Sequence, residues 1–465
     1  MKTLLTKSKL YALILAFFLV LSTMPMTAQN VFADTTLGVD SDGYLLITSE
    51  DELVEHLMSA NKAYKPELSK NFRLTKDLDL SKYTKLRNIG RSGNYESNPL
   101  FKGNFDGNGH TIRNANLNEG GIFSNIDTNA SVRNLTIENA SVSAKSTEYP
   151  GILASKNLGT IENCRVINSN INSSQNGTGG FVGQNAGTIS KSSVINTNVS
   201  AEKSMQVGGF AGFNGYAGKV GTIDQCFADA NVSGKMNVGG FVGKAEKGNI
   251  SNSYALGSIK ANSNEKIGGF AGILASPSQL KNVYVSADVN ANSGGVVAGW
   301  KGSSFASPGE VVNGYYNSEK SKPATEMQEY SGITAKTAAE MSSPRFLGEI
   351  AGSTSGVWAQ DANHNNGMPY LAAVPTPETA PVVPPKDPVK FVICNYNKDT
   401  NTFKKLKEFT VQPEKEDNVV LDLMKRARDE NKFSFTSEES SWGEFVTSID
   451  DIQAPKPDGW MFNVN

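Results

Sequence analysis

The chain has 465 residues, which is enough for about three domains of ordinary size. Its formal net charge of -2 provides no basic field of the kind that attracts nucleic acid, so nucleic acid is excluded as an expected partner. The 44 glycines exceed the average usage of about 7 % and favour a fold built on tight, regular turns.

The first 33 residues are predicted to be a secretory signal peptide. Lys2, Lys7 and Lys9 give a positive start, an apolar run extends from Leu10 to Leu21, and the sequence ending at Ala33 offers a cleavage site. An N-terminal membrane anchor is the alternative, but the run is shorter than the roughly 20 residues that a span needs. We therefore expect a secreted or surface-displayed protein without a transmembrane span in the mature chain.

Residues 34–69 are predicted to lead into the main domain through one short helix. Ser49 and Glu52 have the spacing of a capping box. An apolar-faced helix in this place would cover the first exposed strand edges. The side chains on that face are Leu53, Leu57 and Met58.

Two further patterns precede the repeats. Residues 72–80 alternate well enough for one strand. Residues 101–112 contain Asp106-Gly107 and Asn108-Gly109, dipeptides that supply the positive φ of turns. We interpret this stretch as a turn rather than a calcium site, because it lacks the later bidentate glutamate of a calcium loop.

A glycine-rich block organises the middle of the chain. The sequence Gly-Gly-Phe-x-Gly occurs four times, and its second glycine advances by 29, 31 and 29 residues. A degenerate copy, which we call the worn repeat, follows at residues 294–299. Partial copies of the block at residues 120–123 and 150–153 extend the array toward the N-terminus. A fixed period of this size indicates a repeat architecture. The expected structural repeat residues are Gly180, Phe181, Gly183, Gly209, Phe210, Gly212, Gly240, Phe241, Gly243, Gly269, Phe270 and Gly272.

Small or β-branched residues recur in step with these blocks. An apolar residue opens each unit, and small or β-branched residues mostly stand three, five and nine or ten residues later. An asparagine often stands two residues after the opener. Stacked coils bury such columns at the strand spacing of about 4.8 Å. The openers are Val132, Ile161, Ile189, Ile223, Ile250 and Leu280.

This pattern predicts a mainly β protein, with a parallel β-helix or solenoid over residues 70–320. We expect about seven to eight coils of about 29 residues, with three faces. A propeller is the alternative, but its units of about 40 residues are longer than these.

The cysteines provide a test of this register. Cys164 and Cys226 share one inward column but lie two coils apart, near 9.6 Å at about 4.8 Å per coil. A disulfide needs Cα atoms within about 7 Å. Both are therefore predicted to be buried free thiols. The odd total, with Cys394, also excludes a complete disulfide framework.

The array is expected to end in a closing segment at 321–373, after a last strand at 311–316. One short helix is predicted over 337–350, with Phe346 and Leu347 inward, followed by an aromatic seal. The seal comprises Trp358 and residues 366–371. Six prolines then make 374–388 a semi-rigid linker.

Residues 389–465 are predicted to form a small α+β domain. Its expected elements are a strand at 389–394, a helix at 418–427 and two further strand-like pieces at 444–449 and 459–465.

The four Gly-Phe-x-Gly blocks resemble the bacterial GLUG-type repeat, with phenylalanine where that motif is named for leucine. Residues 77–81 and 105–112 look like the entry to such arrays, and 366–371 looks like their exit. The resemblance covers about residues 70–372. It implies a β-solenoid of the kind found in secreted bacterial surface proteins, including filamentous adhesins, and beside the catalytic domain of immunoglobulin-A peptidases.

The tail is similar to the transcobalamin-like C-terminal domain. Residues 419–424, 443–449 and 459–465 carry this resemblance, including Gly459-Trp460-Met461. In that family the last piece is normally followed by glycine and further strands, whereas this sequence stops at Asn465, so we expect an incomplete domain. The resemblance implies cobalamin only weakly, and we expect no cofactor.

No catalytic constellation is apparent in the sequence. The three histidines, His56, His110 and His364, lack the spacing of a zinc-dependent peptidase motif. We expect no metal ligands and no catalytic residues, and cofactor-binding residues remain unassigned. Polysaccharide cleavage needs clustered acids, but the candidates lie scattered among the coils. They are Asp224, Asp229, Glu246 and Asp288.

We therefore expect an exported, non-catalytic protein that presents its solenoid for adhesion or for binding a glycan, a host protein or a matrix protein. The alternatives are a carbohydrate-active β-helix enzyme, either a polysaccharide lyase or a hydrolase, and a non-catalytic remnant of an immunoglobulin-A-peptidase-like protein. In the first case, function must lie on the outward positions between the apolar columns.

Overall fold

The computed structural model describes residues 36–58, 67–90, 100–145, 148–215, 218–261, 267–290, 309–321 and 331–376, and the backbone of five strands between 389 and 453. It divides into two units. The first runs to residue 374 without 361–367, and the second comprises 361–367 and 375–465. The predicted signal peptide at 1–33 and the worn repeat at 294–299 lie outside the described residues.

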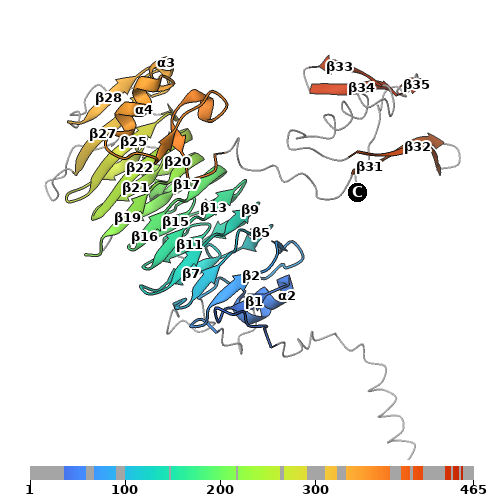
Figure 1. Cartoon of the computed structure of the whole chain (residues 1–465), viewed down its shortest axis with the longest axis horizontal. Coiled ribbons are helices and arrows are strands. Elements are labelled where there is room, and N and C mark those ends of the chain that lie inside the picture. The colour runs from blue at the N-terminus through green and yellow to red at the C-terminus, as the bar shows by residue number, and fades with distance from the viewer. Residues whose placement is uncertain are drawn as a thin grey trace, which may run out of the picture. The chain divides into compact units, whose positions relative to one another are not determined.

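The first unit contains a parallel β-solenoid of about eight turns, which confirms the expected fold class (Figure 1). Its strands lie in a 22-stranded sheet and a six-stranded sheet. A complete coil carries four strand segments instead of the three faces expected from the sequence, because left-handed residues divide the path between the openers and the glycine block. We call the resulting stacks of strands the first, second, third and fourth ladders.

The first three ladders share the 22-stranded sheet. The first consists of β1 (Leu45–Ile47), β2 (Phe72–Leu74), β4 (Asn104–Asp106), β8 (Ser131–Arg133), β12 (Thr160–Glu162), β16 (Thr188–Ser190), β19 (Gly221–Asp224) and the starts of β22 (Gly248–Ala261), β25 (Gln279–Val285) and β27 (Glu310–Asn317). The second consists of β3 (Leu78–Asp79), β5 (Thr111–Arg113), β9 (Thr136–Glu138), β13 (Arg165–Ile167), the starts of β17 (Ser193–Gly208) and β20 (Phe227–Gly239), later parts of β22, β25 and β27, and β28 (Ile333–Lys336).

The third ladder consists of β6 (Asn116–Leu117), β10 (Ser141–Ala144), β14 (Asn170–Ser173), later parts of β17, β20 and β22, and β26 (Asp288–Asn290). The end of β20 also pairs with β23 (Ile267–Gly268). The fourth ladder is the six-stranded sheet of β7 (Phe123–Ile126), β11 (Ala154–Asn157), β15 (Val182–Asn185), β18 (Ala211–Asn214), β21 (Val242–Ala245) and β24 (Ala271–Leu274).

The pairing register confirms the apolar columns. Ile161 pairs with Val132 on one side and Ile189 on the other, and the series continues through Ile223 and Ile250. The side chains of this column are fully buried. Because a slip by one residue would turn every such side chain outward, the burial of the column fixes the register.

The expected asparagine corners are also present. Asn163 donates from Nδ2 to Oδ1 of Asn134 at 2.9 Å, and Asn282 donates in the same way to Asn252 at 3.0 Å. The left-handed backbone lets the chain bend after each opener. Six residues at this corner have φ between 45° and 54°: Asn134, Asn163, Lys191, Gln225, Asn252 and Asn282.

Close approach between coils explains the glycines of the repeat. A Cβ on Gly209 would overlap the carbonyl oxygen of Gly240, and a Cβ on Gly212 would overlap the backbone of Gly177. Between these glycines, Phe210 points inward and stacks on Phe181 at 4.6 Å and on Phe241 at 4.8 Å between ring centroids. The block therefore brings neighbouring backbones together around a central aromatic stack.

A buried amide ladder lies at the end of the fourth-ladder strands and was not predicted. Asn157 donates to Oδ1 of Asn185 at 2.9 Å, and Asn185 donates to Oδ1 of Asn214 at 2.8 Å. All three side chains are fully buried. The amide N–H of Gly187 in turn donates to Asn185 at 3.3 Å, so this ladder satisfies backbone groups at the turn.

The N-terminal lead-in contains the expected helix, with a change in its cap. Ser49 caps α2 (Glu50–Leu53), which continues as a π-helical turn, η1 (Val54–Met58). The Glu52 carboxylate accepts from the Thr48 N–H rather than the Ser49 N–H, so the capping box is displaced by one residue. The predicted apolar face joins the solenoid core. The predicted single strand at 72–80 is wrong, because residues 75–77 bend between β2 and β3.

The segment expected to close the array covers its side. The predicted helix is two helices, α3 (Ala338–Met341) and α4 (Pro344–Ala351), because Ser343 caps a new helix that starts with proline. Phe346 is buried as expected, while Leu347 is only partly buried. The predicted last strand forms most of β27.

This segment packs on an outward aromatic column of the second ladder, which was not predicted. Phe227, Tyr254 and Tyr284 stack at 4.7 and 4.9 Å between ring centroids. Trp358 contacts the two tyrosines, and Phe346 contacts Tyr284 edge-on at 6.0 Å. The predicted aromatic seal therefore lies against the side of the solenoid, on the second ladder, and we call this segment the lateral cover. The remaining elements of this segment in the first unit are β29 (Trp358–Ala359) and β30 (Tyr370–Leu371). The 3-10 turn η2 (Asn365–Gly367) belongs to the second unit.

The second unit contains antiparallel strands. β31 (Val389–Asn397) pairs with β32 (Thr402–Val411), and β34 (Gly443–Ile449) pairs with β33 (Phe435–Ser440) and β35 (Ile452–Gln453). The predicted strands at 389–394 and 444–449 are thereby confirmed. The predicted helix at 418–427 and strand at 459–465 lie outside the described residues. Among the residues that the structure describes, no helix is long and apolar enough to cross a membrane.

Candidate ligand-binding face

The third ladder presents a column of exposed polar side chains, which we call the polar ladder. Asn198 donates from Nδ2 to Oδ1 of Asn170 at 2.8 Å, Asn231 donates to Asn198 at 3.1 Å, and Ser258 donates to Asn231 at 2.7 Å. Each coil therefore orients the outward side chain of the next. In register order the polar ladder is Asn116, Ser141, Asn170, Asn198, Asn231, Ser258 and Asp288.

A second outward column runs beside the polar ladder and has the same chemistry for most of its length. The two columns together form a surface of amides and hydroxyls. Its charged side chains, Lys260 and Asp288, stand in the last two coils of this ladder. The second column contains Ser143, Asn172, Ser200, Ser233 and Lys260.

The first ladder has a different outward surface, in which charges alternate in sign from coil to coil. Arg73, Asp106, Arg133 and Glu162 are successive partners in one column. Asp106 Oδ2 lies 3.4 Å from Arg73 Nε and 3.0 Å from Arg133 Nη2. Each charge is thus matched by its neighbours, which marks this column as a stabilising feature of the stack.

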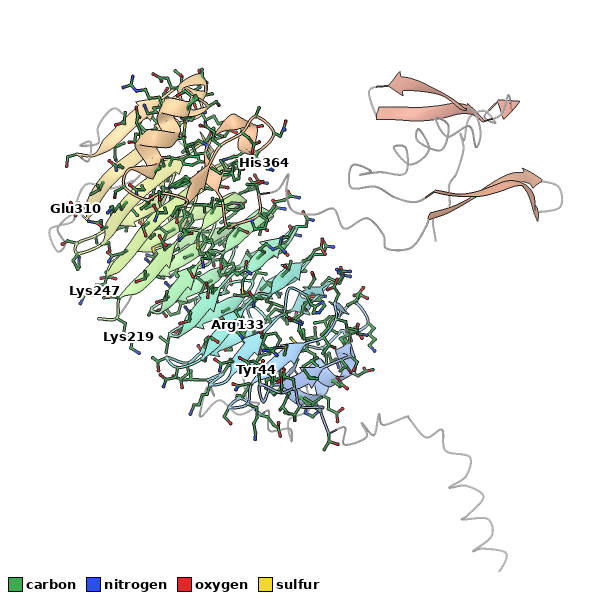
Figure 2. All side chains as sticks on the ribbon, viewed as in Figure 1. Tyr44, Arg133, Lys219, Lys247, Glu310 and His364 are labelled. Carbon is green, nitrogen blue, oxygen red and sulfur yellow. The ribbon has the colours of Figure 1, made fainter. Side chains whose placement is uncertain are left out.

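Asp106 is the best-buried member of this column, with 5 % of its surface exposed. Burial alone would raise the pKa of Asp106, but hydrogen bonds from Asn108 and Asn134 and the charge of Arg133 outweigh it and lower that pKa. Tyr44 lies beneath the Arg73 guanidinium, which is 4.3 Å from the ring centroid. Tyr44 and Arg133 both lie at the N-terminal end of the solenoid (Figure 2).

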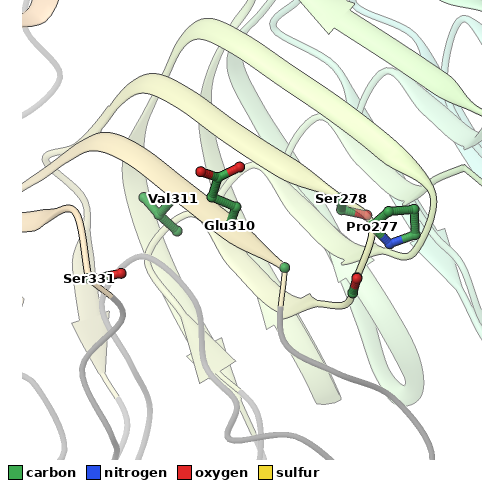
Figure 3. Close-up of a pocket in the computed structure, with 7 residues that line it drawn as sticks. Pro277, Ser278, Glu310, Val311 and Ser331 are labelled. Atoms are coloured by element: carbon green, nitrogen blue, oxygen red, sulfur yellow. The ribbon is translucent and has the colours of Figure 1, made fainter.

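A pocket of about 350 Å³ lies near the C-terminal end of the solenoid. Glu310 and Val311 lie on β27, with Pro277 and Ser278 on the preceding coil (Figure 3). Glu310 accepts a hydrogen bond from Gln279 at 2.7 Å. Among the described residues that line the pocket, Glu310 is the one titratable side chain, whereas glycoside hydrolysis uses a pair of carboxylates.

The structure does not bring the scattered acids together. Asp224 accepts from Ser251 and Asn252 on the first ladder, whereas Glu246 follows β21 and pairs with Lys244 at 2.9 Å. Asp288 lies on the third ladder and Asp229 on the second. Within the described ranges, no group of three or more histidine, cysteine, aspartate or glutamate side chains is placed to hold a metal ion.

Each histidine has its own local setting. His56 is on η1, His110 Nδ1 lies 3.2 Å from Asp77, and His364 Nδ1 lies 2.7 Å from Asp361. The predicted repeat residues all flank or belong to the fourth ladder. A Cβ would overlap the backbone of a neighbouring coil at Gly180, Gly183, Gly209, Gly212, Gly240, Gly243 and Gly272. Their roles are structural.

The two cysteines of the solenoid are buried and free, as predicted. Burial raises the pKa of Cys164 to about 12 and also raises the pKa of Cys226. Each thiol donates to a carbonyl two residues earlier, at 3.3 Å. These thiols are therefore core residues without nucleophilic character.

Comparison with known proteins gives a family match and similar solved structures, two of which are described here. Residues 234–260 match the model of the GLUG motif. The crystal structure of a "putative immunoglobulin A1 protease" from Bacteroides ovatus is 19 % identical, with a TM-score of 0.45, covering 72 % of this chain and 94 % of that one. A structure described as "IgA1 Protease" is also 19 % identical, with a TM-score of 0.44, covering 59 % of this chain and 22 % of that one.

No curated protein matches the chain. The structural likenesses are too distant for either printed activity to be carried over to it. The GLUG match spans the end of β20, all of β21 and most of β22, and it includes Gly240-Phe241-Val242-Gly243. The chain therefore carries a GLUG motif within its β-solenoid, which supports the GLUG-repeat interpretation.

Proposed function

We propose that this protein is exported and uses its solenoid, without catalysis, to bind a ligand outside the cell. The ligand is a glycan or a host or matrix protein. The observation that carries this proposal is the exposed polar ladder, in which hydrogen bonds between coils hold outward amides and hydroxyls in fixed positions. A rigid array of this kind suits recognition, because little side-chain freedom remains to be lost on binding.

The distribution of titratable groups supports a non-catalytic role. The candidate acids Asp224, Asp229 and Asp288 lie on different ladders, and Glu246 follows β21 of the fourth. The buried thiols have raised pKa values. Hydrolysis or elimination in a polysaccharide needs groups that converge on one bond. The carbohydrate-active enzyme is therefore the second candidate. The peptidase remnant would share the non-catalytic solenoid.

Binding is tested by incubating the purified protein with arrays of glycans and of matrix proteins. We expect saturable binding to at least one ligand class. In parallel, reducing-end release from pectin, alginate and hyaluronan is measured with and without calcium, together with cleavage of immunoglobulin A. Turnover of any of these substrates, with no binding on the arrays, would contradict the proposal.

Export is tested separately. Cells expressing the full chain are fractionated, and the N-terminus of the extracellular protein is sequenced. Processing after Ala33 predicts a mature protein that starts at Asp34. Retention of the intact N-terminus inside the cell would refute the export step. The transcobalamin-like interpretation of residues 389–465 remains a proposal, and titration with cobalamin tests its ligand.

A further inference from the structure

We infer that the polar ladder and the column beside it bind one extended, uncharged polysaccharide chain lengthwise, with successive sugar units lying over successive coils. This inference rests on the proposed function and names the ligand class for the same solenoid. It is carried by three properties of the surface: its periodicity, its charge and the hydrogen-bonding groups that it leaves available.

The first property is periodicity. From Asn116 to Ser258, one outward polar residue occurs in each coil, in unbroken register. Five steps at the strand spacing of about 4.8 Å give a linear site about 24 Å long. A site that repeats along one direction is suited to a ligand that also repeats along its length, such as a polysaccharide.

The second property is the absence of charge along most of this surface. The two columns contain only serine and asparagine until the coil of Ser258, where Lys260 appears. Acidic polysaccharides and nucleic acids are attracted by arginine and lysine. A surface of amides and hydroxyls offers no such attraction and instead suits neutral hydroxyl groups.

The third property is the pattern of donors and acceptors. An asparagine amide has two N–H donors and two acceptor lone pairs. Asn198 uses one donor towards Asn170 and one lone pair towards Asn231. One donor and one acceptor therefore remain in each such coil. This combination matches a sugar hydroxyl, which both donates and accepts.

The first ladder provides a control surface in the same coil. Thr188 is exposed and outward there, as Asn198 is on the third ladder. Its surroundings are charged, because Glu162 and Lys191 form an ion pair at 3.0 Å on the neighbouring column. Asn198→Lys and Thr188→Lys add the same charge to two different surfaces of one coil.

The experiment measures binding of the full chain, by affinity electrophoresis and sedimentation, to neutral glucan, mannan and xylan and to acidic alginate and hyaluronan. We expect binding to a neutral polymer. Asn198→Lys and Asn231→Lys should each weaken it by about tenfold or more, while Thr188→Lys changes it by less than about twofold. Circular dichroism melting curves establish that each variant is folded.

A second variant and a length series separate the inference from simple charge effects. Asn198→Ala removes the ladder amide without adding charge and should weaken binding by severalfold. Affinity for neutral oligosaccharides should rise with length until the ligand spans about 24 Å and then level off. An affinity that is independent of length would overturn lengthwise binding.

Other outcomes are equally decisive. Preference for an acidic polymer, or equal binding by wild type and Asn198→Lys, overturns the inference. Binding to a matrix protein but to no neutral polysaccharide overturns it while leaving the proposed function intact. Enzymatic turnover without stable binding overturns both.

Discussion

Truncation of one phenylalanine in the central stack tests whether the Gly-Gly-Phe block holds the coils together. Phe210 is fully buried between Phe181 and Phe241, with interplanar angles of 13° and 4°. Phe210→Ala removes the buried ring and leaves a cavity, which costs about 3–5 kcal/mol. It also removes two aromatic pairs of about 0.5–1.5 kcal/mol each. We therefore expect a loss near the upper end of the first range, about 5 kcal/mol.

The matched controls vary the number of stacking partners and the volume lost. Phe181 has one ring neighbour in the stack, because the register places Leu153 on its other side. Phe181→Ala should therefore cost about 0.5–1.5 kcal/mol less than Phe210→Ala. Phe210→Leu keeps most of the volume and should be much milder than the alanine variant.

The assay is urea unfolding of the purified protein, followed by circular dichroism and by tryptophan fluorescence. Coils contact mainly their neighbours, so coincident transitions by both probes must be shown before free energies are compared. The reasoning is refuted if Phe210→Ala is no more destabilising than Phe210→Leu. A greater loss for Phe181→Ala than for Phe210→Ala would also refute it.

Four further predictions concern other parts of the solenoid. Asn185→Leu should lower the free energy of unfolding by about 3 kcal/mol, since it leaves buried amides and backbone groups unpaired, and urea unfolding measures this loss. Cys164 and Cys226 should resist alkylation in the native protein and react after denaturation, as read by peptide mass spectrometry; rapid native labelling would contradict their burial. Asp106 has a lowered pKa in the folded state, so it stabilises the fold above the ordinary carboxyl pKa of about 3.9. This stabilisation is lost as pH falls through the lower folded pKa. Asp106→Asn should therefore make the melting temperature fall less steeply with decreasing pH, as measured in a melting-temperature series. Trp358→Ala should make the segment that covers the second ladder more sensitive to limited proteolysis, while the far-ultraviolet spectrum of the solenoid persists.

The inward columns could be predicted from the sequence because two constraints coincide there. Val132, Ile161 and Ile189 recur at the coil period, and only one register buries all three. The left-handed corners also follow from residue type, since asparagine tolerates that backbone. The repeat thus specifies both the path of each coil and its alignment with the next.

The lateral cover could not be predicted in the same way. Tyr254 and Tyr284 stand in an outward column. From the sequence alone, a large outward side chain could either be exposed to solvent or pack against a segment that the sequence does not identify. The segment that supplies the partner, from α3 to β30, has no internal period. Its docking depends on tertiary contacts such as Tyr284 Oη donating to the carbonyl of Pro369 at 2.6 Å. The aromatic residues Phe227, Tyr254 and Tyr284 nevertheless recur at the coil period in the sequence, and this spacing marks the outward column that the segment covers.

The polar ladder lies between these cases. Asn170, Asn198 and Asn231 each directly precede a residue of the inward column that stands nine or ten residues after the openers. Their alignment therefore follows from the alignment of that column, which contains Ile171, Val199 and Val232. Their hydrogen bonds do not follow from residue type alone, because they require outward side chains on successive coils to meet at close range. The structure turns a set of polar positions into a connected surface.

The same stacking that aligns apolar residues inside restricts what can be repeated outside. Like charges about 4 Å apart repel by about 1 kcal/mol even in water, so a long column of one charge destabilises its own stack. The first ladder meets this constraint by alternating Arg73, Asp106 and Arg133. The third ladder meets it with amides, which donate to and accept from their own kind. A neutral amide column can therefore repeat over many coils without a bound counter-ion, and its available donors and acceptors point to a neutral ligand. The asparagine side chain is neutral and both donates and accepts hydrogen bonds. This one property explains why the column can repeat from coil to coil and why we propose that it prefers a neutral ligand.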